Sequence, residues 1–243
     1  MHHRSLCLTI ILLFSVNTTC LSKESGFLSF WMGVLRNPEQ VGAIAPGSPF
    51  LAKEISKHID TVGMQDSFEI NQPVRILEAG GGCGALTADI EKRLAHIDKS
   101  YLLDVIEIDP DYCEVLVAKF SHNPNIHIHC ADVSTWNPGY QYDVIISSLP
   151  FTSLPSDLVI RIVEQFKKLA KKEGFISYFE YILLADVKSA YLGVKELFVE
   201  EHPKKEFEKK VRILSDFRRD FGIESKHVLL NVMPAQIHHL KMY

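Results

Sequence analysis

The chain has 243 residues, which is ample for one α/β domain with a full hydrophobic core. Its hydrophobic share of 47% and charged share of 23% are those of an ordinary globular protein, and its net charge of −4 argues against a large nucleic-acid footprint. The five cysteines are scattered and odd in number, so we expect reduced thiols rather than a disulfide framework.

The first twenty residues join a mildly basic start to an apolar run from Leu6 to Val16. They resemble a secretory signal peptide, but the region before Cys20 lacks small alanine-like residues. The apolar run is also shorter than the about 20 residues that span a bilayer. We therefore expect residues 1–24 to be a hydrophobic N-terminal anchor, or to follow a start codon placed too early, rather than to direct export.

A helical cap is predicted over residues 25–60. Residues 25–36 place aromatic and aliphatic side chains at helical spacing, which fits either a core-facing helix or an interfacial helix in the lipid headgroup zone. After a loop rich in proline and glycine, Ser48 can cap a helix that has Pro49 at its first position and runs to about Ile59.

The stretch from Val74 to Thr87 predicts a strand, a glycine turn and a helix. An apolar run ends at the acidic Glu78, and four glycines follow: Gly80, Gly81, Gly82 and Gly84. This layout lets the backbone come close to a nucleotide-like ligand, because a Cβ there would fill the ligand's space or forbid the turn's dihedral angles.

Three more strands are predicted at residues 102–110, 126–133 and 142–151. Glu107 lies near the end of the first of these, where a carboxylate accepts hydrogen bonds from a ribose diol. A predicted helix follows each strand, which implies a parallel sheet with right-handed crossovers. Polar side chains should then converge beyond the carboxyl ends of the strands, namely Glu78, Glu107, Asp132 and Ser148.

The last third of the chain predicts a helix over 155–171, a strand over 174–181 and a strand or strand pair over 227–240. Between them, residues 182–221 are helical in pattern and rich in charge. Their basic residues fit either a solvated helix face or a cationic patch for anionic lipid headgroups.

Four motifs together resemble class I S-adenosylmethionine-dependent methyltransferases: E-A-G-G-G-C-G at 78–84, E-I-D-P at 107–110, A-D-V at 131–133 and S-L-P-F at 148–151. The resemblance implies a Rossmann-like fold with a doubly wound, mostly parallel seven-stranded sheet, in a single domain over residues 25–243. A dinucleotide dehydrogenase is the alternative for the glycine loop alone, and both the glycine spacing and Asp132 disfavour it.

The same resemblance implies the contacts of the cosubstrate S-adenosylmethionine. Gly80, Gly82 and Gly84 would approach its methionine part. Glu107 would hold its ribose hydroxyls, and Asp132 would meet its adenine amino group. The implied cofactor-binding set is completed by Glu78, Val133 and Ser147.

A narrower resemblance is to the bacterial phospholipid N-methyltransferases, which convert phosphatidylethanolamine stepwise towards phosphatidylcholine. It rests on residues 35–48, residues 148–155, Tyr181 and residues 231–235; Gly47 and Ser148 depart from the family's usual residues, and the stretch near 195–220 is unfamiliar. It implies a phospholipid substrate, peripheral membrane contact and a cytoplasmic location at the inner membrane face.

Two alternative functions remain open. Ribosomal RNA adenine dimethyltransferases share the E-I-D strand, but they carry N-L-P-Y/F where this chain has Ser148, and they use a separate basic C-terminal domain that we do not recognise here. RNA is therefore the second choice of acceptor. A non-catalytic nucleotide-binding or membrane-bound regulatory protein is the third, and the intact ligand carboxylates disfavour it.

The acceptor amine must lose a proton before attack, and side chains at strand ends could accept it or orient the amine. The candidates are Ser148, Tyr178, Glu180 and Tyr181, of which Ser148 and Tyr181 are the expected substrate-positioning residues. His127 and His129 alternate on one strand and so share a face. No second ligand pair lies nearby in sequence and methyl transfer needs no metal, so we expect none.

Overall fold

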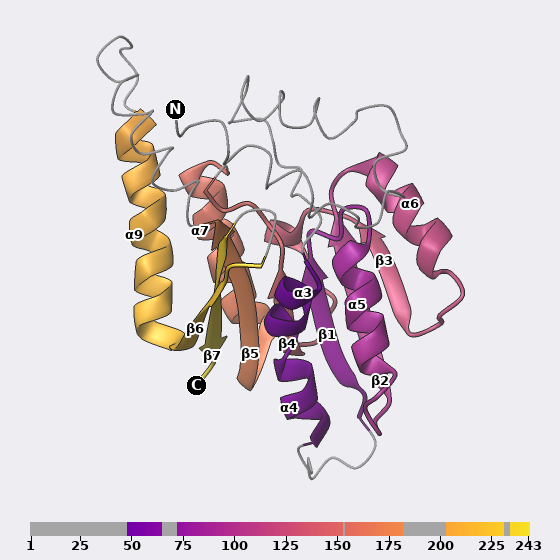
Figure 1. Cartoon of the computed structure of the whole chain (residues 1–243). Helices are drawn as coiled ribbons and strands as arrows, with labels where there is room; N and C mark the ends of the chain where they lie inside the picture. The colour runs from indigo at the N-terminus through magenta and orange to yellow at the C-terminus, as the bar shows by residue number, and fades with distance from the viewer. Residues whose placement is uncertain (1–47, 65–71, 153, 182–202, 231–233) are drawn as a thin grey trace, which may run out of the picture. The chain divides into compact units, whose positions relative to one another are not determined.

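The computed structural model describes residues 48–64, 72–152, 154–181, 203–230 and 234–243 (Figure 1). The expected anchor at 1–24, the helix at 25–36, the motif residues 35–47 and part of the terminal motif, 231–233, lie outside the described residues.

A seven-stranded sheet with the order β3-β2-β1-β4-β5-β7-β6 forms the centre of the described fold (Figure 1). Its strands are β1 (Val74–Ala79), β2 (Tyr101–Glu107), β3 (Ile126–Cys130), β4 (Tyr142–Ser147), β5 (Ala170–Tyr181), β6 (Gly222–Val228) and β7 (Ala235–Lys241). The first five strands pair in parallel, and β7 runs antiparallel to β5 and β6. The predicted doubly wound, mostly parallel sheet is therefore confirmed, with its switch point between β1 and β4.

Helices cover both faces of this sheet. One face carries α3 (Pro49–Ile55), α4 (His58–Met64), α5 (Ala85–Leu94) and α6 (Pro110–Phe120), and the other carries η2 (Val133–Thr135), α7 (Ser156–Leu169) and α9 (Pro203–Phe221). Each face has its own buried apolar cluster. The two clusters share the sheet, because side chains alternate between its faces along every strand.

The start of α3 is as predicted, but its end is not. The Ser48 hydroxyl accepts a hydrogen bond from Leu51 N at 3.3 Å, and Pro49 occupies the first helical position. The predicted helix to Ile59 is interrupted at Ser56, whose hydroxyl donates to Ala52 O at 2.6 Å. A second helix, α4, begins at His58.

Three basic residues of α9 are held in ion pairs. Lys209 Nζ lies 2.9 Å from Asp157, an Arg218 Nη lies 2.5 Å from Glu180, and an Arg219 Nη lies 2.6 Å from Asp216. These contacts offset the cationic charge, and the first two tie the helix to α7 and β5. They favour the first of the two predictions for this helix, a solvated face packed on the domain, over the second, a cationic patch for lipid headgroups.

Cys113 on α6 and Cys130 at the end of β3 form a disulfide, with their Cα atoms 5.8 Å apart. The expectation of reduced thiols is wrong for this pair. The bond joins a helix to the edge strand beside it, an arrangement that cysteine spacing alone does not reveal.

Among the described helices, none has the length and apolar character that crossing a bilayer requires.

Gly84 provides a test of how tightly the turn before α5 packs. It has φ +82°, and a Cβ there would lie 2.7 Å from Phe120 Cε2. Gly139 has φ +81°, but no atom of the described part of the chain lies within 4 Å of a Cβ there. Alanine at either position must adopt an unfavourable left-handed backbone conformation. Only Gly84→Ala also places its Cβ too close to Phe120. We expect Gly84→Ala to lower the free energy of unfolding by about 1–3 kcal/mol more than Gly139→Ala, measured by urea denaturation. Equal losses would show that Phe120 moves aside freely.

Candidate functional site

The glycine loop after β1 is fastened over the end of β2 by backbone hydrogen bonds. Gly80 N and Gly81 N both donate to Ile106 O, at 2.9 and 3.2 Å, and Gly84 N donates to Gly81 O at 2.9 Å. The loop then leads directly into α5, for which Gly84 is the N-terminal capping residue. Backbone N–H groups and a helix N-terminus are thereby gathered at the carboxyl end of the sheet.

Glu107 fixes the middle of this loop. One carboxylate oxygen accepts from Gly82 N at 2.7 Å, and the other accepts from Ile108 N at 2.8 Å and Asp109 N at 2.9 Å. The side chain is only 8% exposed. A carboxylate has about four lone-pair sites, so capacity remains for a further donor such as a hydroxyl.

Glu78, at the carboxyl end of β1, is a fully buried carboxyl group (0% exposed). Neither of its oxygens has a hydrogen-bond partner among the described residues. Burial raises the pKa of Glu78 to about 8. The neighbouring Thr87 hydroxyl, which does not reach hydrogen-bond geometry with either oxygen, opposes this shift, and the negative charge of Glu107 adds to it. Such a group is suited to a cationic partner, because an unpaired buried carboxylate is costly.

Gly82 leaves the space in front of the loop open. It has φ +50°, and no described residue lies within 4 Å of the position that its Cβ would take. At Gly80, by contrast, a Cβ would come within 3.1 Å of Ser148 Oγ and Leu149 Cδ2. Any larger side chain at Gly82 would therefore project into the open space that a ligand could use.

Two further predicted cofactor residues lie just after β3. Asp132 is half-buried and caps η2, since its Oδ1 accepts from Ser134 N at 2.8 Å. Val133 is buried in the adjacent apolar cluster. Because β3 neighbours β2, with Ala131 N bonded to Glu107 O at 2.9 Å, Asp132 lies at the same edge of the sheet as Glu107.

At the end of β4, Ser147 and Ser148 have different roles. The buried Ser147 hydroxyl accepts from Leu149 N at 3.3 Å. The Ser148 hydroxyl donates to the Gly80 carbonyl, and Ser148 N donates to Ala79 O at 3.0 Å. Ser148 is therefore beside the glycine loop, as predicted, but its proton is committed to the loop backbone, so only its oxygen lone pairs are available to a substrate.

Tyr181 ends β5, and it differs from the other two candidates on that strand. The Tyr178 hydroxyl accepts from an Arg218 Nη at 3.1 Å, and that guanidinium also binds Glu180. Tyr181 faces the opposite side of the sheet, and its buried hydroxyl has no hydrogen-bond partner among the described residues. Burial raises the pKa of Tyr181, so the phenol stays protonated.

The structure thus brings together Glu78, Glu107, Ser148 and the glycine loop, with Asp132 at the same edge and Tyr181 on a strand beyond β4. Thr87, which faces Glu78 from α5, was not predicted; a polar residue at a buried helical position was the available signal. A hollow of about 840 Å³ lies elsewhere, among α3, α4 and the end of α5.

The sequence matches a protein family described as ribosomal RNA adenine dimethylase over residues 46–183, more than half of the chain. Three curated proteins illustrate the range of similar enzymes. The ornithine lipid N-methyltransferase of Singulisphaera acidiphila is 26% identical over 148 residues, which are 57% of this chain and 71% of that protein. Ribosomal RNA small subunit methyltransferase A of Mycoplasma mycoides subsp. mycoides SC is 46% identical over 68 residues, 28% of this chain and 23% of that protein.

A malonyl-[acyl-carrier protein] O-methyltransferase of Ilyobacter polytropus is 30% identical over 103 residues, 40% of this chain and 35% of that protein. The matched part therefore spans well under half of two of these three relatives.

Solved structures share the fold. The plantazolicin methyltransferase BpumL, in complex with S-adenosylhomocysteine, has a TM-score of 0.51 at 15% identity and covers 93% of each chain. The N-methyltransferase NodS of Bradyrhizobium japonicum WM9, in complex with the same compound, has a TM-score of 0.51 at 10% identity, covering 88% of this chain and 98% of its own.

The residues gathered at the carboxyl edge of the sheet fit S-adenosylmethionine. Its methionine part carries an ammonium that suits the unpartnered Glu78 carboxyl, its ribose diol suits the remaining acceptor capacity of Glu107, and the open face of Gly82 admits a ligand close to the backbone. The family match and the fold lead to one conclusion: the chain belongs to the ribosomal RNA adenine dimethylase family and has the fold of the class I S-adenosylmethionine-dependent methyltransferases.

Proposed function

We propose that the acceptor is the amino group of a polar lipid of the phosphatidylethanolamine type. The observation that carries this proposal is Ser148. It stands where the adenine dimethyltransferase signature has an asparagine, so the chain has no side-chain amide there to hold an adenine amine. The Ser148 hydroxyl instead donates its proton to the Gly80 carbonyl. The similarity to an ornithine lipid N-methyltransferase, over 71% of that protein, supports a lipid amine.

A ribosomal RNA adenine is the second candidate acceptor. It is favoured by the family's description and by the 46% identity to ribosomal RNA small subunit methyltransferase A. That similarity extends over only 23% of the RNA enzyme, and it leaves most of the RNA enzyme's length unmatched.

We further propose how this chain holds the cosubstrate. Glu78 pairs with the methionine ammonium, and Gly80, Gly82 and Gly84 give that part of the molecule access to the backbone. Glu107 accepts from the ribose hydroxyls, while Asp132, Val133 and Ser147 border the adenine end. Glu107 is already oriented by three backbone N–H groups, so its contribution is preorganised rather than formed on binding.

Bound S-adenosylmethionine supplies an electrophilic methyl group on a sulfonium, and the chain's own task is to present an unprotonated amine in line with it. A lipid primary ammonium has a pKa near that of lysine, about 10, and must first lose a proton. Tyr181 stays a neutral phenol and Glu180 is held by Arg218, so neither acts as the base. The proton leaves to solvent water, and the lone pairs of Tyr181 and Ser148 accept the remaining amine N–H groups and orient the nitrogen.

We also propose that the reaction takes place at the cytoplasmic face of the membrane. The paired basic residues of α9 do not support this part, and the N-terminal residues 1–47 lie outside the described structure. Its support is the proposed lipid acceptor, which lies in a membrane; the Cys113–Cys130 disulfide counts against the cytoplasmic side, because such bonds are rare in cytosolic proteins.

The Glu78→Gln variant should change the stability of the free protein and its affinity for S-adenosylmethionine in opposite directions. The folded-state pKa of Glu78 lies above its ordinary value, so its contribution to stability is full below about pH 4.5 and is lost as the pH rises through about 8. The amide cannot ionise, so we expect the variant to melt at a higher temperature than the wild type at about pH 8 without cosubstrate. It should bind S-adenosylmethionine about 10- to 100-fold more weakly by calorimetry, because a charge-assisted contact is lost.

Glu114→Gln, an exposed carboxyl on α6, is the matched control and should change neither quantity. For the wild type, affinity should rise with pH until Glu78 is ionised. A Glu78→Gln variant that binds the cosubstrate as tightly as the wild type would remove Glu78 from the site.

Tyr181→Phe tests the positioning role of the phenol. The change removes a buried hydroxyl that lacks a partner, so the free enzyme should be as stable as the wild type or more so. The rate of methyl transfer at saturating lipid should fall by about 3- to 10-fold, the value of an ordinary hydrogen bond. Tyr112→Phe on the exposed side of α6 is the control. Unchanged turnover in Tyr181→Phe would mean that the hydroxyl never meets the amine.

The acceptor is tested with labelled S-adenosylmethionine and the full chain. Vesicles containing phosphatidylethanolamine, vesicles containing ornithine lipid, vesicles of phosphatidylcholine and ribosomal RNA are offered separately. We expect label in the amine-bearing lipids and none in phosphatidylcholine, whose nitrogen is already quaternary. Label confined to RNA would overturn the lipid proposal while leaving the methyltransferase assignment intact.

A further inference from the structure

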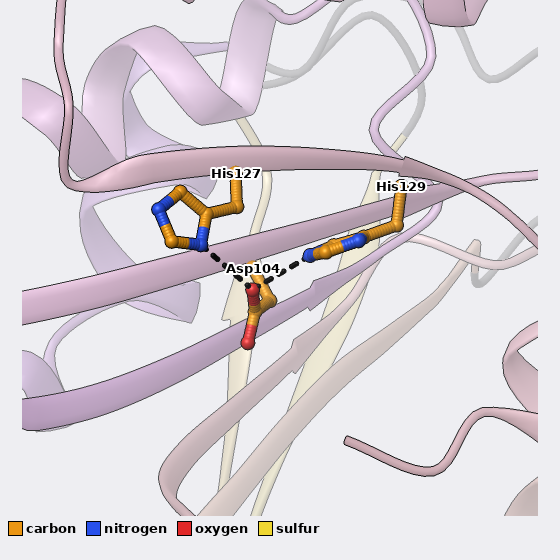
Figure 2. A group of neighbouring side chains, drawn as sticks. All are labelled: Asp104, His127 and His129. Atoms are coloured by element: carbon orange, nitrogen blue, oxygen red, sulfur yellow. Dashed lines mark hydrogen bonds and ion pairs between the residues drawn. The ribbon is translucent and has the colours of Figure 1, made fainter.

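Three side chains with metal-binding atoms, Asp104, His127 and His129, meet on β2 and β3 (Figure 2). They lie on the sheet face that carries α7, as do Tyr140 and Tyr142, which bond to Asp104. Asp104 lies mid-strand on β2 and is fully buried, while His127 and His129 alternate on the edge strand β3. His129 Nε2 lies 2.8 Å from Asp104 Oδ1, and His127 Nδ1 lies 3.8 Å from the same oxygen. One ligand atom from each residue falls within 4.8 Å of the others.

The Asp104 carboxylate is held so that one oxygen faces the histidines. Its other oxygen accepts from the hydroxyls of Tyr140 at 2.6 Å and Tyr142 at 2.8 Å. These two hydrogen bonds occupy one carboxylate oxygen and leave Oδ1 directed at the two histidines. Outer hydrogen bonds of this kind orient the ligands of protein metal sites.

His127 is oriented by a backbone carbonyl in the same way. Its Nε2 lies 3.2 Å from Pro124 O, which can only accept, so we assign the proton of the neutral ring to Nε2. The Nδ1 lone pair then faces the carboxylate oxygen of Asp104. Two acceptors that face each other attract a cation between them, and an imidazole whose other nitrogen donates to a carbonyl is the usual form of a histidine ligand.

We propose that Asp104, His127 and His129 bind a divalent transition-metal cation, with Zn²⁺ as the best fit. Zinc takes imidazole nitrogens and carboxylate oxygens at about 2.0–2.2 Å, so its ligand atoms lie about 3.3–3.5 Å apart in a tetrahedron. The two separations from Asp104 Oδ1 lie on either side of this value, and small side-chain rotations would equalise them. Imidazole ligands disfavour Mg²⁺ and Ca²⁺, which prefer oxygen.

The proposed site is structural rather than catalytic. The ion would hold the edge strand β3 against β2. Because Asp132 follows His129 by three residues, the ion would also fix the position of Asp132, the proposed adenine contact. The His127 side chain is half exposed, which leaves a coordination position open to water. Sequence inspection did not find the site because Asp104 lies 25 residues before His129 and joins it only through strand pairing.

The test uses the full chain after treatment with a chelator. Zn²⁺ alone is added, and its binding is measured by calorimetry, with bound metal counted by mass spectrometry after dialysis and the melting temperature recorded. We expect a single bound ion that raises the melting temperature. His127→Ala should lose that binding and that shift, and because His127 lies on the surface this variant should fold, which circular dichroism verifies.

A second variant, Tyr140→Phe, leaves all three ligands in place and removes one hydrogen bond to Asp104. We expect Zn²⁺ affinity to fall by about 10- to 100-fold. His122→Ala, an exposed histidine on the loop before β3 that is outside the cluster, should bind as the wild type does. The proposal is overturned if the wild type binds no Zn²⁺, or if His127→Ala binds it as tightly as the wild type.

Discussion

The rest of the site depends on the three hydrogen bonds that the Glu107 carboxylate accepts from backbone N–H groups. The carboxylate binds the N–H of Gly82 on one side and those of Ile108 and Asp109 on the other, so the glycine loop and the exit of β2 are fixed to the same group. With the loop held there, Gly82 presents open space, and α5 begins with its N–H groups directed to the same edge. A cosubstrate thus meets a backbone that is already ordered.

The same loop explains what Ser148 does. Its hydroxyl and backbone N–H both bond to the β1 end of the loop, at Gly80 and Ala79. Ser148 thus ties the start of the glycine loop to the end of β4, while Glu107 ties the middle of the loop to the end of β2. The amide of an asparagine in this place would either hydrogen-bond to the loop or point towards the methyl acceptor. Only the second arrangement suits recognition of an adenine amine.

The parts of the site that sequence predicts are those that need only local pattern and strand direction. The strand, glycine turn and helix at 74–87 follow from residue order, and parallel strands bring Glu78, Glu107 and Ser148 to one edge. What sequence does not supply are contacts between elements that are distant along the chain. The disulfide of Cys113 with Cys130 needs α6 to lie beside β3, and the neutralised charges of α9 need Asp157 and Glu180 from other elements.

Two buried carboxyl groups on neighbouring strands show how partners decide the state of a charge. Glu78 on β1 and Asp104 on β2 are both 0% exposed and lie on opposite faces of the sheet. Asp104 receives hydrogen bonds from His129, Tyr140 and Tyr142, which lower its pKa, whereas Glu78 has no partner among the described residues and its pKa rises to about 8. In the proposed cosubstrate site, Glu78 would gain its charge when the cationic ligand binds, which would couple binding at the glycine loop to the release of a proton.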